Sequence, residues 1–188
     1  MTTVDDVGYT YRTARPEDTE TLHALDGSFT TGTVFRVTAT TEGFTLRETP
    51  VDPPVHKVFP PRDTDDDDRA ATEDGDSRTF VATGADGRPV GFAALSYAPW
   101  NRRLTIEDIE VAPAHRGRGV GRALVGHAVG FARERGADHL WLEVTNLNAP
   151  AIHAYRRMGF DFCGLDTALY GGTPASGEQA LYMAMPVR

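Results

Sequence analysis

The sequence has very little cysteine and no long hydrophobic run. Its one cysteine, Cys163, stands alone among 188 residues, so a disulfide framework within the chain is excluded and a cytoplasmic protein is expected. No protease signature surrounds Cys163, which favours a buried structural thiol. No apolar run approaches the roughly 18 residues of a membrane-spanning helix. Residues 1–6 lack the basic and then apolar pattern of a secretory signal, so none is expected.

Basic charge is also scarce. Lys and Arg number 19 against 27 Asp and Glu, which gives a formal net charge of −8. This balance argues against general nucleic-acid binding and favours cationic partners. The six histidines show neither the H-x-x-x-H spacing nor the carboxylate pairing of zinc sites, so no metal is expected. The 188 residues, with 40% hydrophobic and 24% charged content, predict one soluble domain over 1–188.

The hydrophobic pattern predicts a hairpin-rich first half, then strand, helix, strand, helix, strand and strand. Strands are expected at 9–14, 34–40, 44–51, 78–83 and 89–97, with a helix opening at Pro16. Pro53, Pro54, Pro60 and Pro61 are expected to end regular structure. Residues 63–76 are nearly all acidic or small and polar, which predicts a mobile surface loop. In the second half, strands are expected at 104–111, 139–144, 160–164 and 179–185, and helices at 120–135 and after Asn148.

The apolar series of the strand at 104–111 changes phase. Leu104 and Ile106 fall on one face, whereas Ile109 and Val111 continue one residue out of register. One extra residue around positions 107–108 would restore the register, which predicts a β-bulge. A bulge frees backbone groups, so this strand is a candidate ligand-binding edge.

A glycine-rich turn, Arg116-Gly117-Arg118-Gly119-Val120-Gly121, joins this strand to the helix at 120–135. Glycines let the backbone approach a ligand closely, and the first turn of a helix presents N–H groups and a positive dipole end. The turn therefore favours phosphate binding, and a tight turn with solvated arginines is the alternative. The spacing fits neither the dinucleotide pattern G-x-G-x-x-G nor a P-loop.

At this turn the sequence resembles the GNAT superfamily of N-acetyltransferases. Residues 109–113 running into 116–121 look like its acetyl-CoA motif. A second signature, N-x-x-A-x-x-x-Y-x-x-x-G-F, is matched by Asn148, Ala151, Tyr155, Gly159 and Phe160. The resemblance implies a mixed α/β (α+β) fold. Its bent, mostly antiparallel central sheet would have about seven strands, with splayed middle strands and about four flanking helices.

The same resemblance implies acetyl-CoA as the co-substrate. The amides of the turn would bind the pyrophosphate, and residues 109–111 would pair with the pantetheine arm like an added strand. The residues implied in acetyl-CoA binding are Ile109, Glu110, Val111, Arg116, Gly117, Arg118, Gly119, Val120, Gly121, Arg122, Asn148 and Tyr155.

Acetyl transfer to an amine needs a base, a polarised thioester and an acid. A carboxylate must accept the proton of the amine, and a backbone N–H near the bulge is the candidate that polarises the thioester oxygen. Tyr155 resembles the family's general acid; packing in the core is its alternative role. Glu143 lies in an otherwise apolar strand and resembles the base of ribosomal-protein N-terminal acetyltransferases. Glu107, Asp108 and Glu110 stay open as alternative bases.

A closer resemblance, to streptothricin (nourseothricin) N-acetyltransferases, covers nearly the whole chain outside 63–76. It is strongest at 27–31, 34–39, 100–108 and 163–170. It implies direct transfer, in a ternary complex, to an amine of the antibiotic's β-lysine arm, and an acidic site suits such a cationic substrate. The candidate substrate-binding residues are Asp26, Trp100, Glu107, Asp108, Glu110, Asp166 and Tyr170. A protein N-terminal acetyltransferase and a non-catalytic acyl-CoA-binding module remain alternatives, as do a monomer and a homodimer.

Overall fold

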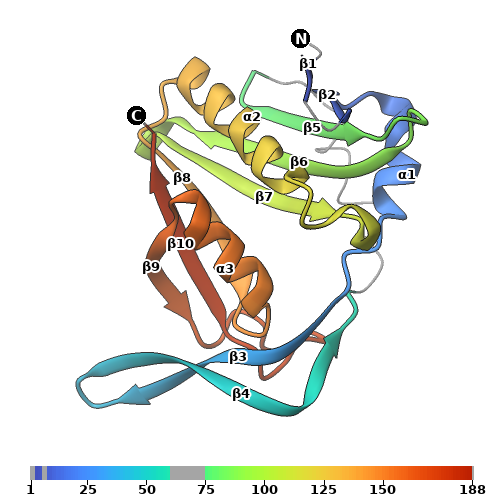
Figure 1. Cartoon of the computed structure of the whole chain (residues 1–188). Helices are drawn as coiled ribbons and strands as arrows, with labels where there is room; N and C mark the ends of the chain where they lie inside the picture. Colours follow the sequence, from blue (N-terminus) through green and yellow to red (C-terminus); the bar gives the residue numbers. More distant parts are fainter. Residues whose placement is uncertain (1–2, 6–7, 60–74, 188) are drawn as a thin grey trace. The chain divides into compact units, whose positions relative to one another are not determined.

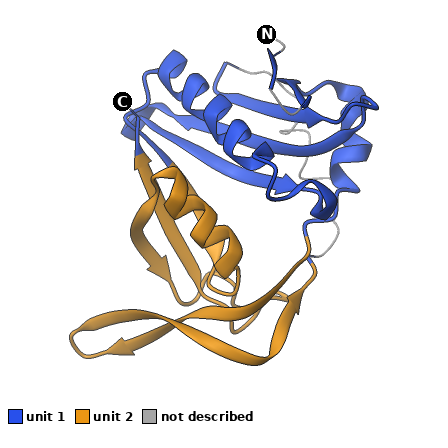
Figure 2. Ribbon diagram, in the orientation of Figure 1, with its two compact units in different colours: residues 1–27, 59–140, 186–188 blue, residues 28–58, 141–185 orange. Residues whose placement is uncertain are grey.

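The structure is a computed structural model that describes residues 3–5, 8–59 and 75–187 (Figure 1). The chain divides into two compact units (Figure 2). Unit 1 comprises residues 1–27, 59–140 and 186–188, and unit 2 comprises residues 28–58 and 141–185. The acidic loop predicted at 63–76 lies outside the described residues except for its last two positions. Within the described part, no helix is long and apolar enough to cross a membrane.

Unit 1 is built on an antiparallel sheet. Its strands are β1 (Thr3–Val4), β2 (Thr10–Thr13), β5 (Ser77–Thr83), β6 (Pro89–Ala98) and β7 (Arg103–Val111), in the order β1-β2-β5-β6-β7. Every pair of neighbours in this order is antiparallel. Helix α2 (Val120–Arg135) packs on β5, β6 and β7, as Figure 1 shows. The 3₁₀ turn η1 (Pro16–Asp18) leads into the short helix α1 (Thr19–His23).

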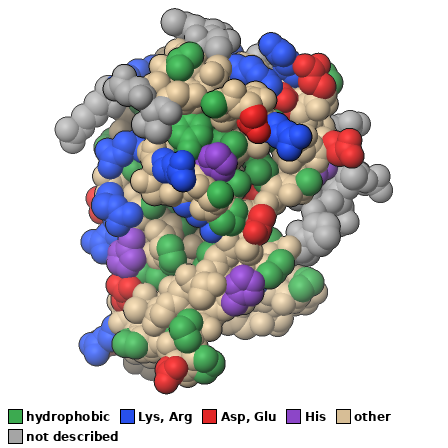
Figure 3. Space-filling view, turned by 45° about the vertical axis from the view of Figure 1, so that its right-hand side comes forward, with side chains coloured by type: hydrophobic (Ala, Val, Ile, Leu, Met, Phe, Trp, Pro, Cys, Tyr) green, Lys and Arg blue, Asp and Glu red, His purple; other side chains and the backbone are tan. Residues whose placement is uncertain are grey.

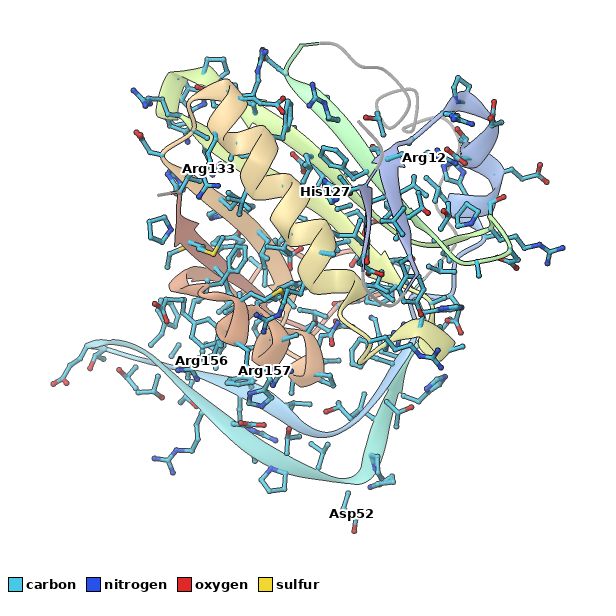
Figure 4. The ribbon with its side chains drawn as sticks, turned by 45° about the horizontal axis from the view of Figure 1, so that its top comes forward. Arg12, Asp52, His127, Arg133, Arg156 and Arg157 are labelled. Carbon is cyan, nitrogen blue, oxygen red and sulfur yellow. The ribbon has the colours of Figure 1, made fainter. Side chains whose placement is uncertain are left out.

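Alternation along β5 explains why helices lie on both faces of this sheet. Phe80 stacks against His127 of α2, labelled in Figure 4, with ring centroids 5.1 Å apart. The next residue, Val81, points to the other face, where it clusters with Phe92 and with Leu22 of α1. Because both faces are covered, β5 is buried along most of its length. This packing gives β7 and α2 a rigid support.

The predicted bulge on β7 is confirmed. Ala94 of β6 faces Asp108, but the next residue, Leu95, faces Ile106, so Glu107 is the extra residue. The out-of-phase apolar series in the sequence therefore had the expected structural cause. Predictions for the following elements also hold, since α2 spans Val120–Arg135 and ends at Gly136, whose φ of 69° is left-handed.

Unit 2 contains a long hairpin and part of a second group of strands. The hairpin pairs β3 (Phe29–Thr40) with β4 (Gly43–Lys57) in antiparallel register. The strand β8 (His139–Thr145) begins in unit 1 and enters unit 2 at Trp141; β10 (Ala180–Pro186) and β9 (Asp161–Asp166) follow in the order β8-β10-β9. Helix α3 (Ala149–Met158) begins after Asn148, whose side chain accepts a hydrogen bond from the Ala151 amide at 3.2 Å.

The prediction that Pro53 and Pro54 end regular structure is wrong. Strand β4 continues to Lys57, because the prolines lie where its pairing with β3 is interrupted. Thr33 faces Pro50 and Thr31 faces Val55, so residues 51–54 oppose one residue, Gly32. Proline cannot donate to a ladder but is tolerated in such a bulge. Figure 4 shows Asp52 at this bend, pointing away from the ribbon.

The predicted mixed α/β fold with mostly antiparallel strands is confirmed, and three α-helices are described with it. The predicted splaying of the middle strands stays a prediction, as does the single-domain organisation. The prediction that Cys163 is a buried thiol is wrong, because Cys163 is exposed. Its strand β9 is mostly exposed or half-buried along its length, so an apolar residue there need not lie in the core.

Candidate functional site

The glycine-rich turn of unit 1 has the backbone conformation that its sequence suggests. It follows the 3₁₀ turn η4 (Pro113–His115), and Gly117 and Gly119 have φ angles of 73° and 91°. Residues other than glycine rarely adopt these left-handed backbone angles. A Cβ at either glycine would meet no atom within 4 Å, so the backbone is open on that side. The glycines are therefore required for conformation and leave the turn accessible.

The turn ends at the N-terminus of α2, where Gly119 is the N-cap and makes no side-chain hydrogen bond. The first amides of a helix have no acceptor within the helix, and no capping side chain accepts a hydrogen bond from them here. The 16-residue helix adds the positive end of its dipole. These features fit a phosphate group, and Arg118 and Arg122 are exposed beside them.

Arg116 is fixed to the backbone instead of extending from the turn. Its Nε donates to the Val111 carbonyl at 2.7 Å, and its Nη2 donates to the Asp26 carbonyl at 3.2 Å. The side chain thus ties the end of β7 to the segment after α1. Arg116 is the first residue of the turn, and its positive charge favours an anionic ligand there.

Strand β7 supplies further predicted residues of unit 1. Ile109, Glu110 and Val111 face Ala93, Phe92 and Gly91 of β6. The Glu110 carboxylate lies against Gly27, where a Cβ would come within 2.5 Å of its Oε1. The bulged Glu107 accepts a hydrogen bond from Ser96.

Trp100 is separated from these carboxylates along the strand. It lies in η3 (Pro99–Asn101), just before β7 begins, whereas Glu110 lies near the end of β7. Its side chain is 85% exposed. Within unit 1 the structure therefore gathers Asp26 and Glu110 near the end of β7 and places Trp100 at the opposite end of the strand.

Glu143 is the central ionisable residue of unit 2. Leu140, Leu142 and Val144 are buried on one face of β8, so Glu143 points to the other face. The Tyr170 hydroxyl donates a hydrogen bond to its Oε1. Burial raises the pKa of the Glu143 carboxyl, the bond from Tyr170 lowers it, and the charge of Glu178 raises it. A carboxylate with a raised pKa suits a general base that works near neutral pH.

Tyr170 is held as a donor. Burial raises its pKa, and the hydrogen bond to Glu143 together with that carboxylate's charge raises it further. The phenol therefore stays protonated and orients the Glu143 oxygen. The sequence predicted Tyr170 only as a substrate-binding residue, so its hydrogen bond to Glu143 is an additional finding.

Three further residues of this region were missed by sequence reasoning: Lys57, Thr145 and Glu178. Glu178 Oε1 accepts a hydrogen bond from the Lys57 ammonium, and its Oε2 accepts one from Thr145 Oγ1 at 2.5 Å. Thr145 lies two residues after Glu143, so both side chains leave the same face of β8. We call Lys57, Glu143, Thr145, Tyr170 and Glu178 the carboxylate cluster.

The other predicted residues of unit 2 have separate partners. The Tyr155 ring on α3 meets the Phe160 ring edge-on, with centroids 5.8 Å apart. Asp166 Oδ1 accepts hydrogen bonds from the amides of Ala168 and Leu169, at 2.7 and 3.0 Å, and so closes the turn that leads towards Tyr170. The cofactor and substrate roles of the predicted residues in both units stay predictions.

Side chains of both charges are mixed on one face of the molecule (Figure 3). Figure 3 shows acidic, basic and hydrophobic side chains interspersed over the face in view. Basic residues also occur on the helices, for example Arg133 on α2 and Arg156 and Arg157 on α3, labelled in Figure 4. Among the described residues, no group of three His, Cys, Asp or Glu side chains could hold a metal ion.

The matches to known proteins include a family profile, a curated relative and a solved structure. The profile of the Acetyltransferase (GNAT) family matches residues 45–160. The streptothricin acetyltransferase of Streptomyces lavendulae is 67% identical over 187 residues, 99% of each chain. The crystal structure of a nourseothricin acetyltransferase, 69% identical, superposes with a TM-score of 0.88 over 96% of this chain and 99% of that one.

A fourth comparison concerns fold alone. A Bacillus anthracis str. Ames protein, solved in complex with acetyl coenzyme A, is 24% identical and has a TM-score of 0.80. The match covers 96% of this chain and 99% of that chain. The fold described above is therefore one that, in another protein, binds acetyl coenzyme A.

Proposed function

This chain belongs to the acetyltransferase (GNAT) family, and we propose that it inactivates streptothricin-type antibiotics by acetylating an amine of their β-lysine moiety. Identity of 67% over 99% of both chains with a streptothricin acetyltransferase is the observation that supports this substrate. The net charge of −8 suits a cationic acceptor. The reaction would take place in the cytoplasm, where acetyl-CoA is made, and requires no metal.

The glycine-rich turn is the proposed holder of acetyl-CoA. The amides of 116–121 would bind its pyrophosphate, and Ile109–Val111 would pair with its pantetheine arm like an added strand. Bound there, acetyl-CoA supplies a thioester whose carbonyl carbon is open to attack by an amine. The left-handed glycines and the uncapped start of α2 support this assignment, because both favour a bound phosphate.

Glu143 is the proposed base and Tyr155 the proposed acid of a direct transfer. Glu143 accepts a proton from the ammonium group of the antibiotic, directly or through water, which leaves a neutral amine. A backbone N–H near the Glu107 bulge polarises the thioester oxygen. Tyr155 donates its phenolic proton to the departing thiolate sulfur. Half-burial of Glu143 and its raised pKa support the first step.

One assay tests the proposed substrate. Release of CoA from acetyl-CoA is followed with streptothricin, with a peptide that begins with alanine, and with no acceptor. We expect fast release with the antibiotic only. Fast release with the peptide but none with the antibiotic would establish the N-terminal acetyltransferase, and binding of acetyl-CoA without turnover of either would establish a non-catalytic module.

A further inference from the structure

Glu178 lies near Glu143, and its charge acts on that carboxyl. The reaction proposed above gives Glu178 no role. Its carboxylate is held at both oxygens, by Lys57 on one side and by Thr145 on the other. The side chains of Lys57 and Glu178 are only 17% and 12% exposed. A half-buried ion pair of this kind is not an ordinary solvated surface contact.

The backbone around Glu178 is fixed by Asn146, the residue after Thr145. The Asn146 amide donates to the Gln179 carbonyl at 2.9 Å, and the Gln179 amide donates to Asn146 Oδ1 at 2.8 Å. Asn146 Nδ2 also donates to the Phe35 carbonyl at 2.8 Å, which ties the hairpin to the same point. Residue 178 is therefore placed against β8 by a buried polar residue.

Lys57 is the only lysine of the sequence, whose other 18 basic residues are arginines. It lies at the last position of β4 and reaches Glu178, 121 residues away in the chain. A lysine ammonium is a compact charge that pairs with one carboxylate oxygen without a planar two-point contact. The second oxygen of Glu178 is thereby left to Thr145.

We propose that Glu178 is a positioning residue of the acetyl transfer, whose pairing with Lys57 decides how strongly a second negative charge acts on Glu143. This inference rests on the proposed function, in which Glu143 is the base. Among the described residues, the titratable groups that interact with Glu143 are Tyr170 from the loop before β10, Tyr182 from β10, and Glu178 itself. Lys57 affects these groups through its ion pair with Glu178. Asp166 affects them through its charge, which raises the pKa of Tyr182.

The signs of the expected effects follow from charge. Loss of the Glu178 charge makes ionisation of Glu143 easier, so the acidic limb of the pH–rate profile moves to lower pH. Loss of Lys57 leaves the Glu178 charge unbalanced, so the limb moves to higher pH. At an effective dielectric constant of about 20, a charge roughly 8 Å away shifts the limb by about 1.5 pH units, and screening by solvent and salt reduces the expected shift to about 1 pH unit.

The kinetic test measures kcat/KM for the antibiotic from pH 5 to 9 in Glu178→Gln, Lys57→Met and Glu178→Asp. We expect the acidic limb to lie at lower pH in Glu178→Gln and at higher pH in Lys57→Met. In Glu178→Asp we expect it at the same pH as in the wild type. Glu42→Gln, an exposed change in the β3–β4 turn, is the control of equal charge and should leave the limb in place. A wild-type limb in Glu178→Gln, or shifts of the same sign in the first two variants, would overturn the proposal.

A second measurement needs no turnover and no acceptor. In protein labelled with ¹³C-lysine, the side-chain Cε signal comes from Lys57 alone. We expect this chemical shift to differ clearly between the wild type and Glu178→Gln, and to stay unchanged in Glu42→Gln. Identical shifts in wild type and Glu178→Gln would show that the ion pair is absent in solution and would overturn the inference. Absence of CoA release in the wild type would instead overturn the proposed function.

Discussion

The glycine-rich turn of unit 1 is built from backbone groups, whereas the carboxylate cluster of unit 2 is built from side chains. The turn offers backbone amides whose direction is set by two left-handed glycines a few residues apart. The cluster offers side chains from β4, from β8 and from the loop before β10, held by one another. We therefore expect the turn to govern affinity for acetyl-CoA and the cluster to govern the rate of proton transfer.

The largest expected effect is that of Glu143→Gln. Glutamine keeps the shape of the side chain but cannot accept the proton, so kcat at neutral pH should fall by roughly 10²-fold or more. The acetyl-CoA KM should change little. Steady-state CoA release measures both constants, with Glu42→Gln as the control. A near-normal kcat would transfer the role of base to Glu107, Asp108 or Glu110.

Tyr155→Phe should have the next largest effect. Phenylalanine keeps the ring contact with Phe160 but has no proton to give to the thiolate. We expect kcat to fall by at least about tenfold, far more than the acetyl-CoA KM rises. Tyr97→Phe removes a hydroxyl elsewhere and should be neutral. An unchanged kcat in Tyr155→Phe would remove this residue as the acid.

Gly119→Val should alter the glycine-rich turn and weaken the binding of acetyl-CoA. Valine strains a backbone with φ of 91° by about 1–3 kcal/mol, and relaxation of the turn would misdirect its amides. We expect roughly tenfold weaker binding of acetyl-CoA, with kcat at saturation nearly retained. Gly126→Ala, in the interior of α2 with no atom within 4 Å of its Cβ, is the matched control. Equal affinities in Gly119→Val and wild type would contradict a phosphate site at the turn.

Tyr170→Phe should give the smallest effect, a shift in pH dependence. The hydrogen bond from Tyr170 lowers the pKa of Glu143, so its removal raises that pKa further above the ordinary range. Since Glu143 must be deprotonated to act, the acidic limb should move to higher pH by about half a unit. Activity well above the limb should stay near wild type. A limb that moves to lower pH would contradict the assigned contact.

The comparison also explains which features the sequence could predict. The turn, the bulge at Glu107 and the ends of α2 arise from neighbours in the chain, and a local pattern was enough to locate them. Glu143 was selected because a carboxylate is unusual in an apolar strand, and its role as the base stays a prediction. The Lys57–Glu178 pair joins residues 121 positions apart, so no local pattern marks it. The polar Thr145, the last residue of β8, and Asn146 after it are the local signal for the polar contacts with residues 178 and 179.

The prolines of β4 illustrate the same limit. Pro53 and Pro54 predict the end of a strand when read locally. Pairing with β3 leaves residues 51–54 outside the ladder, and the strand then resumes to place Lys57 at its end. The residue that completes the carboxylate cluster therefore depends on a bulge that only the partner strand reveals.

The central claim is that the turn governs affinity for acetyl-CoA and the carboxylate cluster governs proton transfer. The most direct test is calorimetric titration of acetyl-CoA into Gly119→Val and Glu143→Gln, compared with the wild type. The account predicts a dissociation constant about tenfold higher for Gly119→Val and within about twofold of wild type for Glu143→Gln. The reverse result, weak binding in Glu143→Gln and unchanged binding in Gly119→Val, would contradict it.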